Sequence, residues 1–130
     1  MSDDEWKTFF QLGASILADG PTVAKPCETW CAWTTFRRLT DDAGYWTGGF
    51  PKLPDIANTN IQDGGVWMQP FSYSELAHII IPRRFRWESA PGPDYATGTH
   101  EQNVDALSEQ LITGGILHRL TDLVLEIKLY

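Results

Sequence analysis

An apolar residue occupies every second position at the C-terminal end of the chain, and this pattern constrains the fold more than any other. The four positions are Leu123, Leu125, Ile127 and Leu129. A period of two is typical of a β-strand that buries one face. We therefore expect a half-buried strand at residues 123–130. Residues 116–120 form a short segment that can pair with it as a hairpin.

The N-terminal segment has the period of a helix instead. Ser2 and Glu5 have the spacing of a capping box, in which each side chain accepts a hydrogen bond from the backbone of the other residue. Apolar residues then recur at helical spacing, at Trp6, Phe9, Phe10, Gly13, Ile16 and Leu17. This pattern predicts an amphipathic helix at residues 4–18.

A second helix is predicted before the C-terminal hairpin. Residues 99–102 have the form of another capping box, and the Gly114-Gly115 pair is a stop signal. The apolar stripe between them consists of Val104, Leu107, Leu111 and Ile112.

Three stretches in the middle of the chain favour strands. Residues 28–39 are rich in Trp, Thr and Phe, and residues 78–82 contain a run of isoleucines. Residues 83–87 place Arg84 and Arg86 on one face of an extended segment, and Phe85 and Trp87 on the other.

These elements together predict an α+β fold. Its mostly antiparallel sheet would have four or five strands, with the two helices packed on one face so that their apolar stripes are buried. A length of 130 residues is typical of one domain, so we expect a single globular domain over residues 1–130.

The chain is acidic, with seventeen Asp and Glu against ten Lys and Arg and a net charge of −7. Such a charge favours a basic protein partner over nucleic acid, whose phosphates it repels. No apolar stretch is long enough to span a bilayer, and the acidic N-terminus does not resemble a secretory signal. We therefore expect a cytoplasmic protein without a membrane partner.

The long connection at residues 40–65 is the first place to look for a functional site, because long anchored loops often carry function. Aromatic side chains dominate the energetics of many interfaces, and here they lie among carboxylates that would attract a basic protein. The candidate protein-binding residues are Asp41, Asp42, Tyr45, Trp46, Phe50, Asp55 and Asp63. In the alternative reading, the aromatic residues point inward and anchor the connection to the body.

Two other functions stay open at this point. A small metal-dependent hydrolase could use loop carboxylates such as Asp55 and Asp63 with one of the histidines. A nucleic-acid-facing adaptor could use the clustered arginines, namely Arg37, Arg38, Arg83, Arg84 and Arg86. Cys27 and Cys31 are too far apart on a strand to share a metal ion, so we expect no metal site and no cofactor.

The second half of the chain resembles a family of small bacterial α+β proteins that has no assigned activity. The resemblance covers mainly residues 71–130. It is carried by the segment Pro70-Phe71-Ser72-Tyr73-Ser74-Glu75, the run Ile79-Ile80-Ile81-Pro82, a helix after it, and the terminal Leu125-Glu126-Ile127 strand. In size, acidity and lack of a recognisable catalytic motif, the chain is also similar to immunity proteins, which bind and block a cognate bacterial toxin. This likeness of kind implies a non-enzymatic inhibitor and assigns no residue a role.

Overall fold

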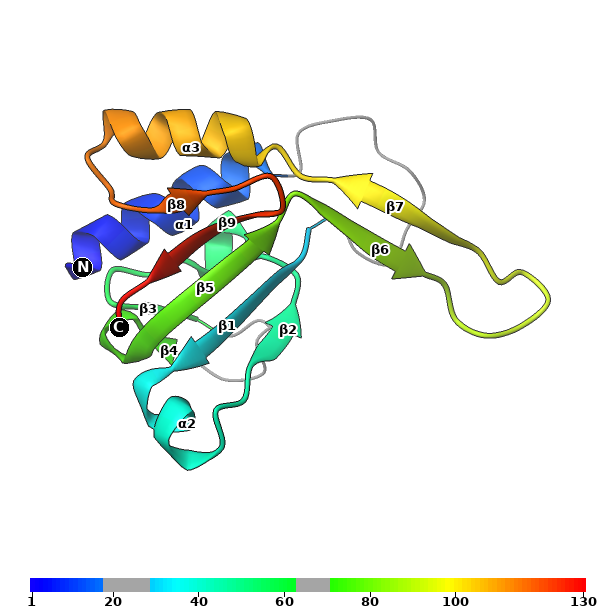
Figure 1. Cartoon of the computed structure of the whole chain (residues 1–130), viewed down its shortest axis with the longest axis horizontal. Coiled ribbons are helices and arrows are strands. Elements are labelled where there is room, and N and C mark those ends of the chain that lie inside the picture. The colour runs from blue at the N-terminus through cyan, green and yellow to red at the C-terminus, as the bar shows by residue number, and fades with distance from the viewer. Residues whose placement is uncertain (18–28, 63–70) are drawn as a thin grey trace.

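A five-stranded antiparallel sheet forms the centre of the protein (Figure 1). The computed structural model describes residues 1–17, 29–62 and 71–130. In spatial order the strands are β2 (Trp46–Gly48), β1 (Cys31–Thr35), β5 (Leu76–Pro82), β9 (Val124–Lys128) and β8 (Arg119–Leu120). The predicted α+β class and the antiparallel sheet are confirmed, and so is the C-terminal hairpin, since β8 pairs with β9.

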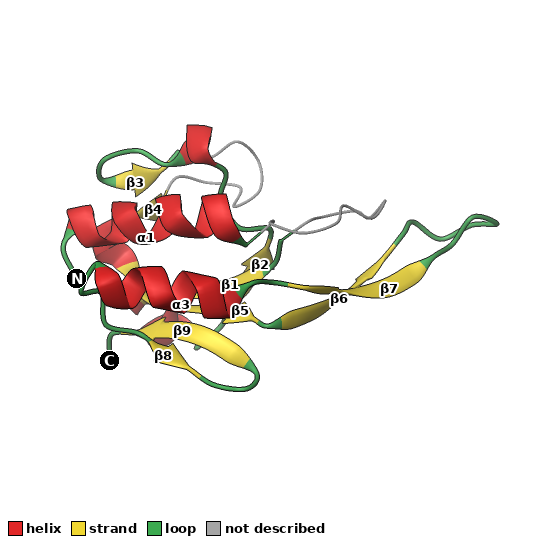
Figure 2. Ribbon diagram, turned by 90° about the horizontal axis from the view of Figure 1, so that it is seen from above, coloured by secondary structure: helices red, strands yellow, loops and turns green. Residues whose placement is uncertain are grey.

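Two helices lie side by side on one face of this sheet, as predicted (Figure 2). They are α1 (Asp3–Ile16) and α3 (Val104–Thr113). The predicted capping box of α1 is present: the Ser2 hydroxyl accepts from the Glu5 amide at 3.1 Å, and the Glu5 carboxylate accepts from the Ser2 amide at 3.1 Å. The helix begins where these bonds satisfy its free N–H groups.

The helices and the sheet enclose one core that is rich in aromatic rings. On α1 the rings of Trp6, Phe9 and Phe10 are buried, and Phe9 and Phe10 both contact Phe50. Alternate residues of the strands complete the core from the sheet, at Cys31, Trp33, Ile79, Ile81, Leu125 and Ile127. The period of two predicted for the last strand therefore places Leu125 and Ile127 in the core.

The predicted start of the second helix is wrong. Residues 99–102 do not cap it; most of them lie in β7 (Thr97–Glu101), which pairs with β6 (Arg84–Glu88). Asn103 is the actual N-cap, and its side chain accepts from the Ala106 amide at 3.2 Å. Pairing with β6 satisfies the backbone of this segment, so the local capping pattern is overridden.

The predicted strand at residues 28–39 is shorter in the structure. Pairing between β1 and β5 shifts register at Thr34/Thr35, and the chain then turns into the short helix α2 (Phe36–Asp41). The Thr35 hydroxyl caps this helix by accepting from the Arg38 amide at 3.1 Å. The cap fixes the point where strand geometry ends.

The predicted connection at residues 40–65 contains several short elements. After β2 come the 3-10 turn η1 (Leu53–Asp55) and β3 (Asn60–Ile61), which pairs with β4 (Phe71–Ser72). A second 3-10 turn, η2 (Tyr73–Glu75), leads into β5. Within the part of the chain that the structure describes, no helix has the length and apolar character needed to cross a bilayer.

A pair of substitutions on α3 tests the packing. Leu107 is fully buried, whereas Ile112 on the same helix is 69% exposed. We expect Leu107→Ala to lower the free energy of unfolding by about 2 to 5 kcal/mol, because the cavity left in the core refills poorly. Ile112→Ala serves as the control and should change it by about 0.5 kcal/mol or less. Urea unfolding followed by circular dichroism measures both, and equal effects would contradict this packing.

Candidate functional site

The helix α2 and the edge strand β2 border a hollow of about 680 Å³. Three of the predicted binding residues, Asp41, Asp42 and Trp46, line it. The other lining residues come from α2 and its cap and from the β4–η2 segment; they are Thr35, Phe36, Arg37, Arg38, Phe71, Ser74 and Glu75. The hollow therefore joins two parts of the chain that are distant in sequence.

Aromatic rings form the apolar part of the hollow. Trp46 points to the core side of β2, where its ring stacks on Trp33 at 6.4 Å and lies 5.2 Å from Phe71. The guanidinium of Arg38 lies 4.0 Å from the centre of the Trp46 ring, a distance typical of a cation–π contact. The same guanidinium packs on Gly44, where a Cβ atom would be only 2.7 Å from Arg38 Nε. Arg38 and Trp46 are thus held in fixed positions.

The carboxylates of the hollow differ in how firmly they are held. Asp42 accepts from the Gly44 amide at 2.8 Å and from Arg38 Nε at 3.3 Å, and these bonds lower the pKa of Asp42, the backbone bond most. Within the described part of the chain, the one ion pair of Asp41 is with Arg37 at 3.7 Å, and the Arg37 side chain is 90% exposed. An exposed pair of this kind is worth little, so Asp41 can exchange partners at small cost.

Tyr45 directly precedes β2, and its contact with His78 places its side chain on the opposite face of the sheet from Trp46. Its hydroxyl is 2.8 Å from Nδ1 of His78 on β5 and 2.9 Å from the hydroxyl of Tyr130. On the other side of the imidazole, Nε2 lies 3.8 Å from the Glu126 carboxylate on β9. Tyr45, His78, Glu126 and Tyr130 form a polar row on the sheet face that faces away from α1 and α3.

Burial shifts the pKa of two members of this row, His78 and Tyr45. It lowers the pKa of His78, and the nearby Glu126 carboxylate offsets only part of that effect. Burial also raises the pKa of Tyr45 to about 12, with the Tyr130 hydroxyl adding to the shift. A neutral imidazole is best placed with its Nε2–H toward Glu126, so Nδ1 accepts the Tyr45 proton. Both nitrogens then face groups of the protein itself.

Besides Tyr45, two more of the predicted binding residues lie away from the hollow. Phe50 is 3% exposed, and its ring fills the space beside Gly13, where a Cβ atom would be 2.4 Å away. Phe50 is therefore a core anchor, and its assignment to a binding surface was wrong. Asp55 ends η1, which packs beside α1 (Figure 2). Asp63 lies outside the described residues.

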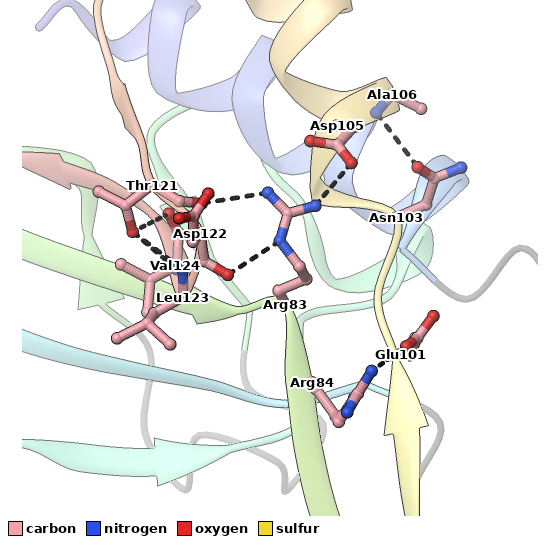
Figure 3. Close-up of polar contacts among 10 residues, drawn as sticks. All are labelled: Arg83, Arg84, Glu101, Asn103, Asp105, Ala106, Thr121, Asp122, Leu123 and Val124. Atoms are coloured by element: carbon pink, nitrogen blue, oxygen red, sulfur yellow. Dashed lines mark hydrogen bonds and ion pairs between the residues drawn. The ribbon is translucent and has the colours of Figure 1, made fainter.

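The clustered arginines are tied to other parts of the protein. Arg83 donates from Nη1 to Asp105 at 2.6 Å and from Nη2 and Nε to the carbonyls of Thr121 and Asp122 at 3.0 and 3.2 Å (Figure 3). Arg84 pairs with Glu101 across the β6–β7 hairpin. Their charges face carboxylates and carbonyls, not one shared surface.

The described segments hold no group of three His, Cys, Asp or Glu side chains placed to bind a metal ion. Cys31 is buried, and burial raises the pKa of its thiol. Cys27 lies outside the described residues.

Some residues of the site could not be chosen from the sequence. The sequence presents Arg38 only as part of a basic cluster, and Glu75 only within the segment that carries a resemblance. No pattern in the sequence singles out His78, which lies within β5; among the residues that the structure describes, its Nε2 makes no hydrogen bond. Only the pairing of β5 with β1 and β9 brings it between Tyr45 and Glu126.

Comparison with models of protein families, with curated proteins and with solved structures gives no match for this chain.

The burial of His78 predicts a specific pH dependence. In the folded protein its pKa is below the value of 6.5 expected when it is unfolded. The unfolded chain therefore binds a proton first as pH falls, and the free energy of unfolding decreases from about pH 6.5 downward through the folded pKa. Above about pH 6.5, the neutral His78 ring makes its full contribution to the free energy of unfolding.

Titration of the imidazole resonances by NMR measures this pKa. The resonance absent from His78→Gln identifies His78, and its midpoint should lie below 6.5. The same variant should lack the part of the pH-dependent loss of stability that His78 causes. A midpoint at or above 6.5 would contradict the enclosed, neutral imidazole.

Proposed function

We propose that this chain is a non-enzymatic protein-binding domain, an immunity-type inhibitor that binds and blocks a basic toxin domain in the cytoplasm. The observation that carries the proposal is the hollow beside α2, with the rings of Trp46 and Phe71 inside it and Asp41 and Glu75 among its lining residues. A concave site with aromatic rings and a few charged groups is typical of a place where a partner inserts side chains.

The chemistry of the hollow suits a basic side chain. Trp46 is partly exposed and offers apolar area to the stem of a lysine or arginine, whereas Phe71 is 4% exposed and packs against Trp46 from within. Asp41 can leave its loose pair with Arg37 to accept the cationic head. Glu75 uses one carboxylate oxygen, Oε2, to accept from the Ser72 amide. The net charge of −7 would speed the encounter with a basic partner.

The positions of the arginines do not favour the nucleic-acid adaptor. Arg37, Arg38, Arg83 and Arg84 each have a carboxylate within 4 Å, so their charges are largely balanced. The hydrolase alternative places Asp55 in its active site, and Asp55 is not among the residues that line the hollow.

A charge reversal in the hollow tests the proposal. The chain would be mixed with basic toxin domains encoded next to its gene, and binding measured by calorimetry together with rescue of cells that express the toxin. Asp41→Lys should weaken binding about tenfold or more, because it places a like charge opposite the partner. Glu109→Lys, at an exposed position of α3, makes the same change in net charge and should leave affinity near that of the unchanged chain.

Two outcomes would overturn the proposal. One is that no toxin domain binds and none is neutralised in cells. The other is that both lysine variants weaken binding equally. The loss of affinity would then come from the change in net charge alone, and the hollow would have no specific role in binding.

A further inference from the structure

The β6–β7 hairpin is a two-stranded sheet of its own and is not part of the five-stranded sheet. Residues 84–101 leave the body at the end of β5 and project away from it (Figures 1 and 2). The chain then returns to where it left, since the Gln102 amide donates to the Arg83 carbonyl at 2.8 Å. β5 and α3 could therefore be joined directly. We call residues 84–101 the arm.

The base of the arm is fixed on three sides. The side chain of Arg83 bonds Asp105 at the start of α3 and two carbonyls of the β8–β9 turn (Figure 3). Gln102 is 2% exposed; its amide group bonds both the N–H and the carbonyl of Trp30 at 2.9 Å and the carbonyl of Pro82 at 2.8 Å. The direction of the arm is thus set by the body, although an isolated hairpin is only marginally stable.

Among the described residues, the contacts between the arm and the body come from the first part of the arm. Phe85 is 6% exposed and stacks on Trp30 at 6.3 Å. Farther out, Trp87 closes over Gly98, where a Cβ atom would be 2.9 Å from the indole. Residues 90–97 are all exposed. The outer half of the arm is therefore held mainly by its own contacts.

The tip of the arm, residues 88–96, is ordered by its own bonds. The Tyr95 hydroxyl donates to the Glu88 carboxylate at 2.6 Å, and the Tyr95 amide donates to the Gly92 carbonyl at 3.1 Å. Ser89 and Ala96 close the loop, through the Ser89 amide to the Ala96 carbonyl at 2.8 Å and the Ala96 amide to the Ser89 hydroxyl at 2.7 Å. Pro91 and Pro93 restrict the backbone further. Such a tip loses little conformational entropy when it binds.

The tip carries one sign of charge. It contains Glu88 and Asp94, and no Lys or Arg occurs between Arg86 and Arg119. A rigid, convex, acidic element is complementary to a concave surface lined by Lys and Arg. Clefts of that kind are found in proteins that bind polyanions such as nucleic acid.

We propose that the tip of the arm inserts into a basic cleft of the toxin domain, of the kind that would bind a polyanionic substrate. This inference rests on the proposed function, since it takes the partner to be a basic toxin. It adds a second contact surface, apart from the hollow beside α2. The tip would occupy the cleft as a plug that excludes the substrate.

A shortened arm tests the inference. Replacing residues 90–95 by Asn-Gly keeps the Ser89/Ala96 pair and closes the hairpin with a two-residue turn, for which Asn-Gly is favoured. With the basic toxin domain encoded next to the gene as the probe, we expect Kd to rise about tenfold or more and inhibition of the toxin to be lost. Circular dichroism and thermal unfolding check that the body is folded.

Asp94→Lys provides a second variant that leaves the hairpin intact. It should weaken binding about tenfold, and more at low salt than at high salt, because a charge contact is screened. Glu109→Lys is the control with the same change in net charge, and it should bind like the unchanged chain.

The outcomes separate the two proposals. If the shortened arm and Asp94→Lys bind like the unchanged chain while Asp41→Lys is weakened, the role of the arm is wrong and the proposed function stands. If the arm variants bind normally and so does Asp41→Lys, neither surface is the interface. If the unchanged chain binds no basic toxin domain, both proposals fail.

Discussion

The packing of Phe50 against α1 is the contact on which the positions of the other site residues depend. Its ring lies 5.9 Å from Phe9 and 5.5 Å from Phe10 and occupies the space that Gly13 leaves free. This contact fixes the chain just after β2, and among the described strands β2 pairs with β1 alone. A short edge strand has few ladder bonds, so the buried aromatic ring does much to fix its place.

Once β2 is fixed, Trp46 and the residue before it place their side chains on opposite faces of the sheet. Trp46 faces the hollow and stacks on Trp33, whereas Tyr45 crosses to the other face and bonds His78. The aromatic residues that are adjacent in sequence thus serve different surfaces. Arg38 completes the arrangement, because its guanidinium covers Trp46 while its Nε bonds Asp42.

The arginines of the chain orient structural elements more than they form a charged surface. Arg83 illustrates this, since its side chain joins the end of β5 to α3 and to the turn before β9. These bonds of Arg83 set the direction in which the arm leaves the body. A preformed arm and a preformed hollow both reduce the entropy that binding would cost, which agrees with a domain that acts by contact.

The features that depend on local pattern could be predicted without the structure. Three features could be predicted because each follows from the spacing of residues along one element. They are the capping box at Ser2 and Glu5, the buried face of α1, and the alternation of Leu125 and Ile127. From these the α+β class and the antiparallel sheet could be predicted. The candidate site was only partly predictable: Asp41, Asp42 and Trp46 line the hollow, but Phe50 is in the core.

The remaining features follow from the folded arrangement, since they depend on pairings between distant segments. Residues 99–102 have a capping pattern, yet pairing with β6 makes most of them part of a strand. His78 gains Tyr45, Tyr130 and Glu126 as neighbours only when β5 is placed between β1 and β9. The local sequence determines which face of an element is apolar. The elements that cover this face are determined by packing between segments distant in sequence, and such packing leaves no periodic pattern in the chain.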